Sequence, residues 1–176
     1  MINQYRFILT GAQGEGKTTF AKQLIDLLSE KHNIGGLLSH GFWKNNMRDR
    51  FEIEDIMTGT RELICNTNPG KNDIQFRHFY FKESGFIFGD CAIQHALEAQ
   101  AEIILIDEIG PLELEGKGWA GNLNKILISS CRLVIFVVRR ALVEAVVKKW
   151  SMQQVDIIDT GKIKPEVVKA MIEKIL

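Results

Sequence analysis

The sequence predicts a three-layer α/β fold, in which helices cover both faces of a mostly parallel central sheet and a small β-hairpin is inserted. Apolar runs of strand length alternate with helical patterns along most of the 176 residues. Fully apolar strands separated by helices are typical of parallel sheets that are buried on both faces. The length suits one buried core, so we expect residues 1–176 to form one domain.

The first half of the chain contains a glycine-rich segment and the predicted hairpin. Phe7–Leu9 is a short apolar strand that is interrupted at Gly11. In residues 17–31 apolar side chains recur every three or four positions, which predicts a helix with one buried face. Residues 35–43 form the second expected strand. The segment 50–67 has two extended runs around a Gly-containing turn, and this pattern predicts a β-hairpin.

After the hairpin the alternation of strands and helices resumes. Residues 66–73 contain Asn-Pro-Gly and are expected to form a loop, and residues 74–81 form a further extended segment. Continuous apolar runs and helical spacing predict the remaining elements. We expect helices over residues 89–100, 122–130 and 141–150, strands over 103–106, 133–138 and 155–158, and a closing helix that begins at Pro165.

The segment Gly11–Thr18 fits the pattern G-x-x-x-x-G-K-[ST] at every position. Glycines let the backbone curl around a phosphate so that several amide hydrogens point inward, and the following helix adds its positive N-terminal end. In such loops Lys17 reaches the β- and γ-phosphates and the Thr18 hydroxyl ligates Mg²⁺. We therefore expect a nucleoside triphosphate, ATP or GTP, with Mg²⁺ as cofactor. The expected phosphate-binding residues are Gly11, Gln13, Gly14, Glu15, Gly16, Lys17, Thr18 and Thr19.

Carboxylates follow the apolar strand at residues 103–106. Asp107 comes directly after this strand, where such enzymes hold Mg²⁺ through water. Glu108 is the next residue, at the sheet edge where ligands bind, and it suits a base that orients and deprotonates a water facing the γ-phosphate. Glu113 fits three roles: a metal ligand, a positioning group, or the cap of a turn.

Several arginines are candidates for stabilising the transition state. An arginine near the γ-phosphate commonly accelerates hydrolysis. Arg139 and Arg140 follow the strand 133–138, and we take Arg139 as the catalytic candidate. Arg48, Arg50 and Arg61 compete for this role from the predicted hairpin, and a surface role fits each of these side chains as well.

Composition narrows the classes of partner. Lys plus Arg and Asp plus Glu both number 22, so there is no basic excess of the kind that marks a nucleic-acid-binding protein. Cys65, Cys91 and Cys131 are widely spaced, which predicts reduced and mostly buried thiols. The apolar runs are too short to span a bilayer, and the N-terminus lacks a signal-peptide pattern. We expect a cytoplasmic protein, a monomer or weak oligomer, without a membrane or nucleic-acid partner.

Three segments together resemble the THEP-type nucleoside triphosphatases, which are small P-loop proteins similar to RecA-like and nucleotide-kinase folds. They are Gly11–Thr19, Ser39–Phe42 and Asp107–Glu113. The last segment, read as D-E-x-G-x-x-E, discriminates best, because many superfamilies share the phosphate loop. The chain departs from the family pattern at residues 43–51, where arginines and a phenylalanine remain but glycines are missing.

The resemblance implies Mg²⁺-dependent hydrolysis of ATP, GTP and related triphosphates, with low selectivity for the base. It assigns phosphate binding, metal binding and water activation to Lys17, Thr18, Asp107 and Glu108. It also implies that the loop after the last strand, with Thr160 and Lys162, meets the base.

Two other functions use the same triphosphate site. A small-molecule or nucleotide kinase would transfer the phosphoryl group to an acceptor and would need a pocket that excludes water. A nucleotide-switched accessory protein would use slow hydrolysis to time a partner interaction, but the chain has no Asn-Lys-x-Asp guanine-reading motif.

Overall fold

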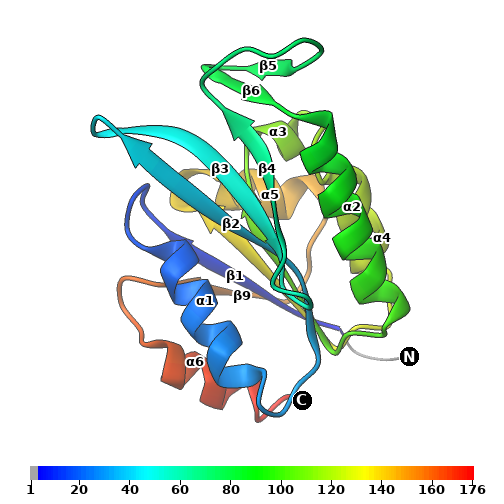
Figure 1. The fold of residues 1–176 in the computed structure, drawn as a ribbon. Helices are drawn as coiled ribbons and strands as arrows, with labels where there is room; N and C mark the ends of the chain where they lie inside the picture. The colour runs from blue at the N-terminus through cyan, green and yellow to red at the C-terminus, as the bar shows by residue number, and fades with distance from the viewer. Residues whose placement is uncertain (1–3) are drawn as a thin grey trace.

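The computed structural model describes residues 4–176, so residues 1–3 of the predicted domain lie outside the described residues. The described strands form one sheet in the order β5-β6-β4-β3-β2-β7-β8-β1-β9 (Figure 1). The strands are β1 (Tyr5–Gly11), β2 (Ile34–Lys44), β3 (Met47–Asp55), β4 (Arg61–Asn66), β5 (Ile74–Phe76), β6 (Phe79–Phe81), β7 (Ile103–Ile109), β8 (Leu133–Arg139) and β9 (Val155–Asp159). The helices are α1 (Lys17–Leu28), α2 (Glu83–Glu98), α3 (Pro111–Leu114), α4 (Ala120–Leu127), the 3₁₀ turn η1 (Arg140–Leu142), α5 (Val143–Lys149) and α6 (Pro165–Ile172).

The parallel half of the sheet consists of β2, β7, β8, β1 and β9, and it confirms the predicted fold class. The side chains of Leu133–Val138 in β8 are almost completely buried, since this strand has a parallel neighbour on each side and helices above and below. Continuous apolar strands of this kind require cover on both faces. The sequence pattern therefore identified these strands correctly, with ends that differ by only a few residues.

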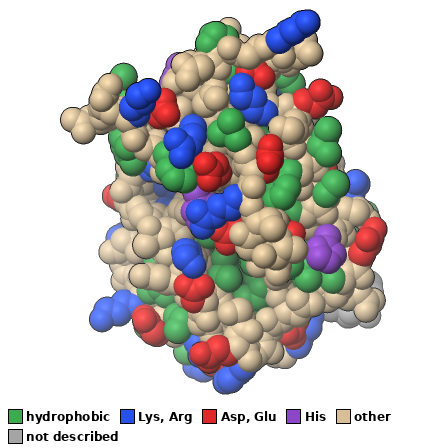
Figure 2. All heavy atoms as spheres, in the orientation of Figure 1, with side chains coloured by type: hydrophobic (Ala, Val, Ile, Leu, Met, Phe, Trp, Pro, Cys, Tyr) green, Lys and Arg blue, Asp and Glu red, His purple; other side chains and the backbone are tan. Residues whose placement is uncertain are grey.

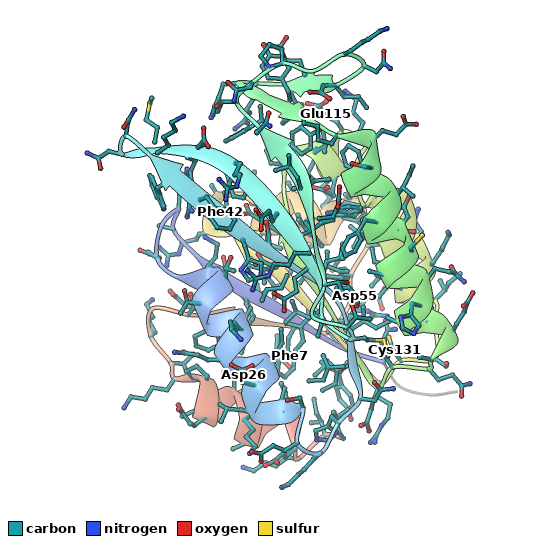
Figure 3. The ribbon with its side chains drawn as sticks, viewed as in Figure 1. Phe7, Asp26, Phe42, Asp55, Glu115 and Cys131 are labelled. Carbon is teal, nitrogen blue, oxygen red and sulfur yellow. The ribbon has the colours of Figure 1, made fainter. Side chains whose placement is uncertain are left out.

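Helices cover both faces of the sheet and create two cores. Phe7 and Leu9 of β1 pack with α1 and α6, whereas Ile8 between them packs in the core that includes α2, α4 and α5. This follows from the strand geometry, because successive side chains point to opposite faces. Figure 3 labels one member of each core, Phe7 on the side of α1 and Cys131 on the side of α4. The sheet is thus the middle of three layers.

An antiparallel extension, formed by β3, β4, β6 and β5, continues the same sheet beyond β2. The predicted hairpin is confirmed as β3 and β4, but the antiparallel part is larger, so four of the eight strand pairings are antiparallel. The reason lies at Asn45 and Asn46, whose φ angles of 49° and 61° form a tight turn between β2 and β3. Asparagine tolerates this left-handed conformation without a glycine. In Figure 1 the β2–β3 turn and the β5–β6 hairpin both project from the upper end of the molecule.

Two helical segments differ from the prediction. Helix α2 begins six residues earlier than expected, at Glu83, and includes Gly85 and Gly89. These glycines allow close packing, since a Cβ at Gly85 would lie 2.6 Å from the Leu63 carbonyl oxygen and one at Gly89 would lie 2.3 Å from the Trp119 ring. Helix α3 was not predicted. The extended segment 74–81 is divided into β5 and β6 by a turn.

The three cysteines are free, as the spacing predicted. Cys65 and Cys131 are buried and Cys91 is exposed, so the prediction of mostly buried thiols holds for two of the three. None of the helices in the described part of the chain is both long and apolar enough to cross a membrane. Figure 2 shows basic, acidic and apolar side chains interspersed on the face in view, in agreement with the equal numbers of acidic and basic residues.

Candidate active site

The phosphate loop lies between β1 and α1, as predicted. Gly14 and Gly16 have φ angles of 83° and 77°, in the left-handed region that glycine adopts without strain. The Lys17 Nζ donates to the Ala12 carbonyl oxygen at 2.8 Å, so the lysine side chain lies along the loop. The Glu15 carboxylate accepts a hydrogen bond of 2.5 Å from the Ala12 N–H. The loop thus has the curled form needed to surround a phosphate, with one of its amides bonded to Glu15.

Asp107, in β7, lies beside the start of helix α1. Asp107 is 1% exposed, and its carboxylate lies near the Thr18 hydroxyl and 3.4 Å from the Ser39 N–H in β2. Burial raises the pKa of Asp107 to about 7, against the lowering effect of the nearby Thr18 hydroxyl. A carboxylate and a hydroxyl are oxygen ligands of the kind that Mg²⁺ prefers. A cation would also compensate this desolvated carboxylate, so the two residues predicted to bind metal fit the ion.

Glu108 follows Asp107 through a cis peptide bond and pairs with Arg139, at the end of β8. The Arg139 Nε donates to the Glu108 Oε1 at 2.5 Å, and both side chains are about two-thirds buried. The predicted base and the predicted arginine therefore touch each other. Arg140 turns elsewhere, toward Asp159 at 3.1 Å and Glu15 at 3.5 Å.

Glu113 is buried at the first turn of α3. One carboxylate oxygen accepts the Gly110 N–H at 2.8 Å, and the other accepts the Trp119 N–H at 3.2 Å. Burial raises the pKa of Glu113 to about 7. Of the three roles open to this residue, the structure shows the cap of a turn, because both oxygens are used by the backbone. The glycine, proline and glutamate at positions 110, 111 and 113 have the spacing of a capping box, a signal that identifies this role in the sequence.

The predicted base-binding loop lies beside the phosphate loop. The Thr160 N–H and hydroxyl both donate to the Thr10 carbonyl oxygen, at 2.9 and 3.0 Å, and so join the end of β9 to the end of β1. Lys162 is 82% exposed, with its Nζ 3.4 Å from Asp159. Thr160 borders the phosphate loop, since a Cβ at Gly11 would lie 3.0 Å from its hydroxyl oxygen. A role of Thr160 and Lys162 in binding the base stays a prediction.

A cavity of about 530 Å³ adjoins the carboxylates, and the sequence did not predict it. Gln13, Asp107, Glu108 and Arg139 line one part of it. The other walls come from the antiparallel extension, α2 and the α3 region, with Phe51, Phe79, Phe81, Phe86 and Trp119 among their residues. The aromatic residues within 76–81 supply part of this wall. The signal in the sequence is the dense aromatic content of this segment, but its position depends on contacts between distant elements.

Of the three hairpin arginines considered for catalysis, Arg48 lines the cavity. Arg50 and Arg61 pair instead with Glu52 and Glu54, at 3.2 and 2.7 Å. Of the arginines considered for catalysis, Arg139 and Arg48 therefore line the cavity.

The sequence model of the NTPase family matches residues 6–176 of this chain. The chain belongs to the NTPase family. Among related proteins, the nucleoside-triphosphatase THEP1 of Sulfolobus acidocaldarius is 29% identical over 161 residues, which cover 90% of this chain and 91% of that protein. The THEP1 of Thermofilum pendens is 32% identical over 124 residues, covering 70% and 68%. The resemblance to THEP-type proteins is thereby confirmed, and the NTPase family places the chain among nucleoside triphosphatases.

Solved structures agree with this family assignment at the level of the fold. A human cancer-related nucleoside triphosphatase has a TM-score of 0.71 and 19% identity to this NTPase family member. THEP1 from the hyperthermophile Aquifex aeolicus has the same TM-score and 20% identity. In both comparisons the match covers 97% of this chain and 96% of the other, so the antiparallel extension belongs to a fold that matches over almost its full length.

Proposed function

We propose that this protein hydrolyses nucleoside triphosphates to the diphosphate and phosphate in a Mg²⁺-dependent reaction with low selectivity for the base. The observation that carries the proposal is the position of Asp107 beside Thr18. This position brings the first turn of α1 next to β7, and it supports a pairing of the two oxygen ligands that a P-loop enzyme offers to Mg²⁺. When bound, the ion neutralises charge on the β- and γ-phosphates.

The remaining groups suit hydrolysis. Lys17 reaches the β- and γ-phosphates after exchanging its contact with the Ala12 carbonyl for the ligand. Glu108 orients the attacking water and takes its proton as the water oxygen bonds to the γ-phosphorus and the bridging bond to the β-phosphate breaks. Arg139 holds the Glu108 carboxylate through a 2.5 Å hydrogen bond and adds positive charge next to the γ-phosphate. Glu113 acts as a positioning residue that fixes the segment after Glu108.

Low base selectivity is proposed from the loop at residues 159–162. Lys162 is largely exposed and Thr160 is bonded to the backbone of β1, so neither is arranged as a rigid reader of one base edge. The Asn-Lys-x-Asp motif that reads guanine is missing from the sequence.

The test is phosphate release by the purified protein with ATP, GTP, CTP and UTP, each measured with Mg²⁺ and with EDTA. We expect Mg²⁺-dependent release from several of the triphosphates. Strict dependence on one base would contradict the low selectivity. Tight triphosphate binding without any release would contradict hydrolysis and favour the kinase or the nucleotide-switched protein.

A further inference from the structure

The cavity next to the carboxylates is much larger than hydrolysis requires. An attacking water occupies about 30 Å³, whereas the cavity measures about 530 Å³ and is in the size range of small-molecule sites. Gln13 and Glu108 line it together with residues from the antiparallel extension. The space therefore connects the predicted position of the γ-phosphate with a region that the hydrolysis of a triphosphate leaves unused.

The cavity begins at Gln13 of the phosphate loop and extends away from the predicted base loop. The phosphate loop follows β1 and the predicted base loop follows β9, and these two strands are neighbours at one end of the sheet. Most of the cavity walls come from β2, β3, β4, β6 and the α3 region, and the strands among them lie on the other side of β7. Asp107 and Glu108 stand at the end of β7, between the two regions. A molecule in the cavity would approach the γ-phosphate from the side away from the base.

The walls of the cavity are suited to a ring system. The rings of Phe51 and Phe79 meet edge to face with centroids 5.4 Å apart, and those of Phe81 and Phe86 stack at 5.7 Å. Phe86 also meets Trp119 edge to face at 5.5 Å. Aromatic walls of this kind bind flat or alicyclic apolar groups through contact area and edge-to-face geometry.

The cavity has carboxylates on the side of β7 and α3, whereas the antiparallel extension supplies Arg48 and Arg77, so an anionic group is suited to the side of the extension. Arg48 places its guanidinium 4.3 Å from the centroid of the Trp43 ring and donates to the Gly41 carbonyl oxygen at 2.6 Å. Arg77 also lines the cavity. Within residues 4–176 neither arginine has a carboxylate within 4.0 Å, in contrast to Arg50 on the same strand as Arg48. Guanidinium groups with free donors at an apolar cavity favour carboxylate, sulfonate or phosphate groups.

We propose that this cavity binds a second small molecule, an organic anion with an aromatic or alicyclic ring system, beside the γ-phosphate of the bound triphosphate. The ring packs against Phe79 and Phe86, the anionic group contacts Arg48, and the opposite end faces Glu108. The position relative to the γ-phosphate rests on the proposed function, whereas the binding itself does not. A ligand bound there occupies the path along which water reaches the γ-phosphate from the cavity, so it lowers the rate of phosphate release.

The first experiment measures binding without nucleotide, using anilinonaphthalene sulfonate as the probe, because it combines fused rings with an anionic group. The chain has three tryptophans, and a variant with Trp43→Phe and Trp150→Phe retains Trp119, which lines the cavity, as its single donor. We expect saturable binding of one probe per folded chain, with energy transfer from Trp119. Circular dichroism confirms that each protein is folded. Unsaturable binding, or binding without transfer from Trp119, would overturn the proposal.

Two matched variants test the anion contact. Arg48→Gln and Arg50→Gln remove the same charge from the same strand, but the irregularity in the β2–β3 pairing at Phe42 and Trp43 leaves Arg50 over the Phe42 ring, outside the cavity. We expect the dissociation constant of the probe to rise about tenfold in Arg48→Gln, as for the loss of a charge-assisted contact, and to stay within about twofold in Arg50→Gln. Equal effects of the two substitutions would refute the assigned contact.

Addition of ADP distinguishes the cavity from the nucleotide site. Saturating ADP with Mg²⁺ is expected to leave the affinity for the probe unchanged, because ADP has no γ-phosphate next to Glu108. Competition between ADP and the probe would place the nucleotide itself in the cavity and overturn the proposal. Intact probe binding in a protein that releases no phosphate from any triphosphate would instead reject the proposed function and retain the cavity as a ligand site.

Discussion

The parallel strands and the antiparallel extension belong to one sheet but are buried to very different extents. In β8, six consecutive residues are buried, whereas in β5 and β6 none of the six residues is. The parallel half carries the phosphate loop and the carboxylates at strand ends that cannot shift without disturbing the core. The extension carries arginines and aromatic rings on a surface that remains open to a ligand. Chemistry and recognition of a second molecule are thus assigned to parts with different freedom to move.

The same contrast appears in the charged groups. In the parallel half, the Asp107 carboxylate lies beside Thr18 and 3.4 Å from the Ser39 N–H, and Glu108 is bonded to Arg139. In the extension, Arg48 lies over aromatic rings instead of a carboxylate. The carboxylates of Asp107 and Glu108, which the proposed reaction requires in one geometry, are held by polar contacts. Arg48, which is proposed to contact a ligand, keeps some of its N–H donors free.

The largest expected effect concerns stability. Phe136→Ala in β8 removes a completely buried ring, and we expect it to lower the free energy of unfolding by about 3–5 kcal/mol. Phe79→Ala removes a partly buried ring beside an existing cavity, and we expect a loss of about 1 kcal/mol. Urea denaturation followed by circular dichroism measures both. Equal losses would show that the extension is as tightly packed as the parallel half.

The second prediction concerns triphosphate binding by the parallel half. Lys17→Ala removes the cation that contacts the β- and γ-phosphates, so we expect the affinity for a triphosphate with Mg²⁺ to fall at least about a hundredfold. The matched control is Lys22→Ala on the same helix, whose Nζ is exposed and lies 3.3 Å from Asp26. Isothermal titration calorimetry measures both variants. A similar loss of triphosphate affinity in Lys17→Ala and Lys22→Ala would show that Lys17 has no specific role in binding the nucleotide.

The third prediction separates binding from chemistry. Glu108→Gln keeps the size of the side chain but cannot take a proton, so we expect triphosphate affinity to be retained while kcat falls about a hundredfold. Glu115→Gln is the control, because Glu115 is exposed and pairs with Lys117. Steady-state phosphate release and nucleotide titration measure the two quantities. Unchanged turnover in Glu108→Gln would exclude this residue as the base.

The smallest effect concerns Glu113, at the border between the two regions. Burial raises its pKa from 4.5 to about 7, so the folded state binds the proton more tightly than the unfolded state does. Its contribution to stability is therefore fully present below pH 4.5 and is lost as the pH rises through 7. Relative to Glu113→Gln, which does not titrate, the wild type should lose about 2 kcal/mol between pH 5 and pH 7.

Denaturation of both proteins across this pH range tests the Glu113 prediction, and the contribution of Asp107 cancels in the difference between them. A constant difference would show that the carboxylate remains ionised in the folded state. The substitution also leaves one of the two capped N–H groups without an acceptor, because the glutamine NH₂ group only donates, but this loss does not change with pH in the variant.

The sequence predicted the parts of the fold that depend on local patterns. Apolar strands, the phosphate loop and the Asp107-Glu108 pair are each contained in a few consecutive residues. The structure has the loop after β1 and the pair in β7, the two strands that flank β8. The turn at Asn45 and Asn46 was missed because it contains no glycine. The start of α2 was missed because glycines weaken its helical pattern, although they permit close packing with β4 and Trp119.

The cavity could not be read from the sequence, because its walls come from elements far apart in the chain. The faces of Arg48 and Arg50 illustrate the difficulty. In a regular strand, residues two apart point to the same face, but the irregular β2–β3 pairing sets Arg48 opposite Trp43 and Arg50 opposite Phe42. One extra residue in β3 thus determines that Arg48, and not Arg50, lines the cavity. The local sequence contains no pattern that predicts this irregularity.

Strand β2 takes part in both regions. Its first residues, Ile34–Leu37, pair with β7, and its later residues, Leu37–Lys44, pair with β3. Between these contacts the Ser39 N–H lies 3.4 Å from the Asp107 carboxylate, and farther along Trp43 lines the cavity. Strand β2 is thus anchored in the parallel half at its first residues and borders the cavity near its last residues. A ligand that displaces Trp43 would therefore act on the amide beside Asp107 through three intervening residues of one strand, across the irregular pairing at Phe42 and Trp43.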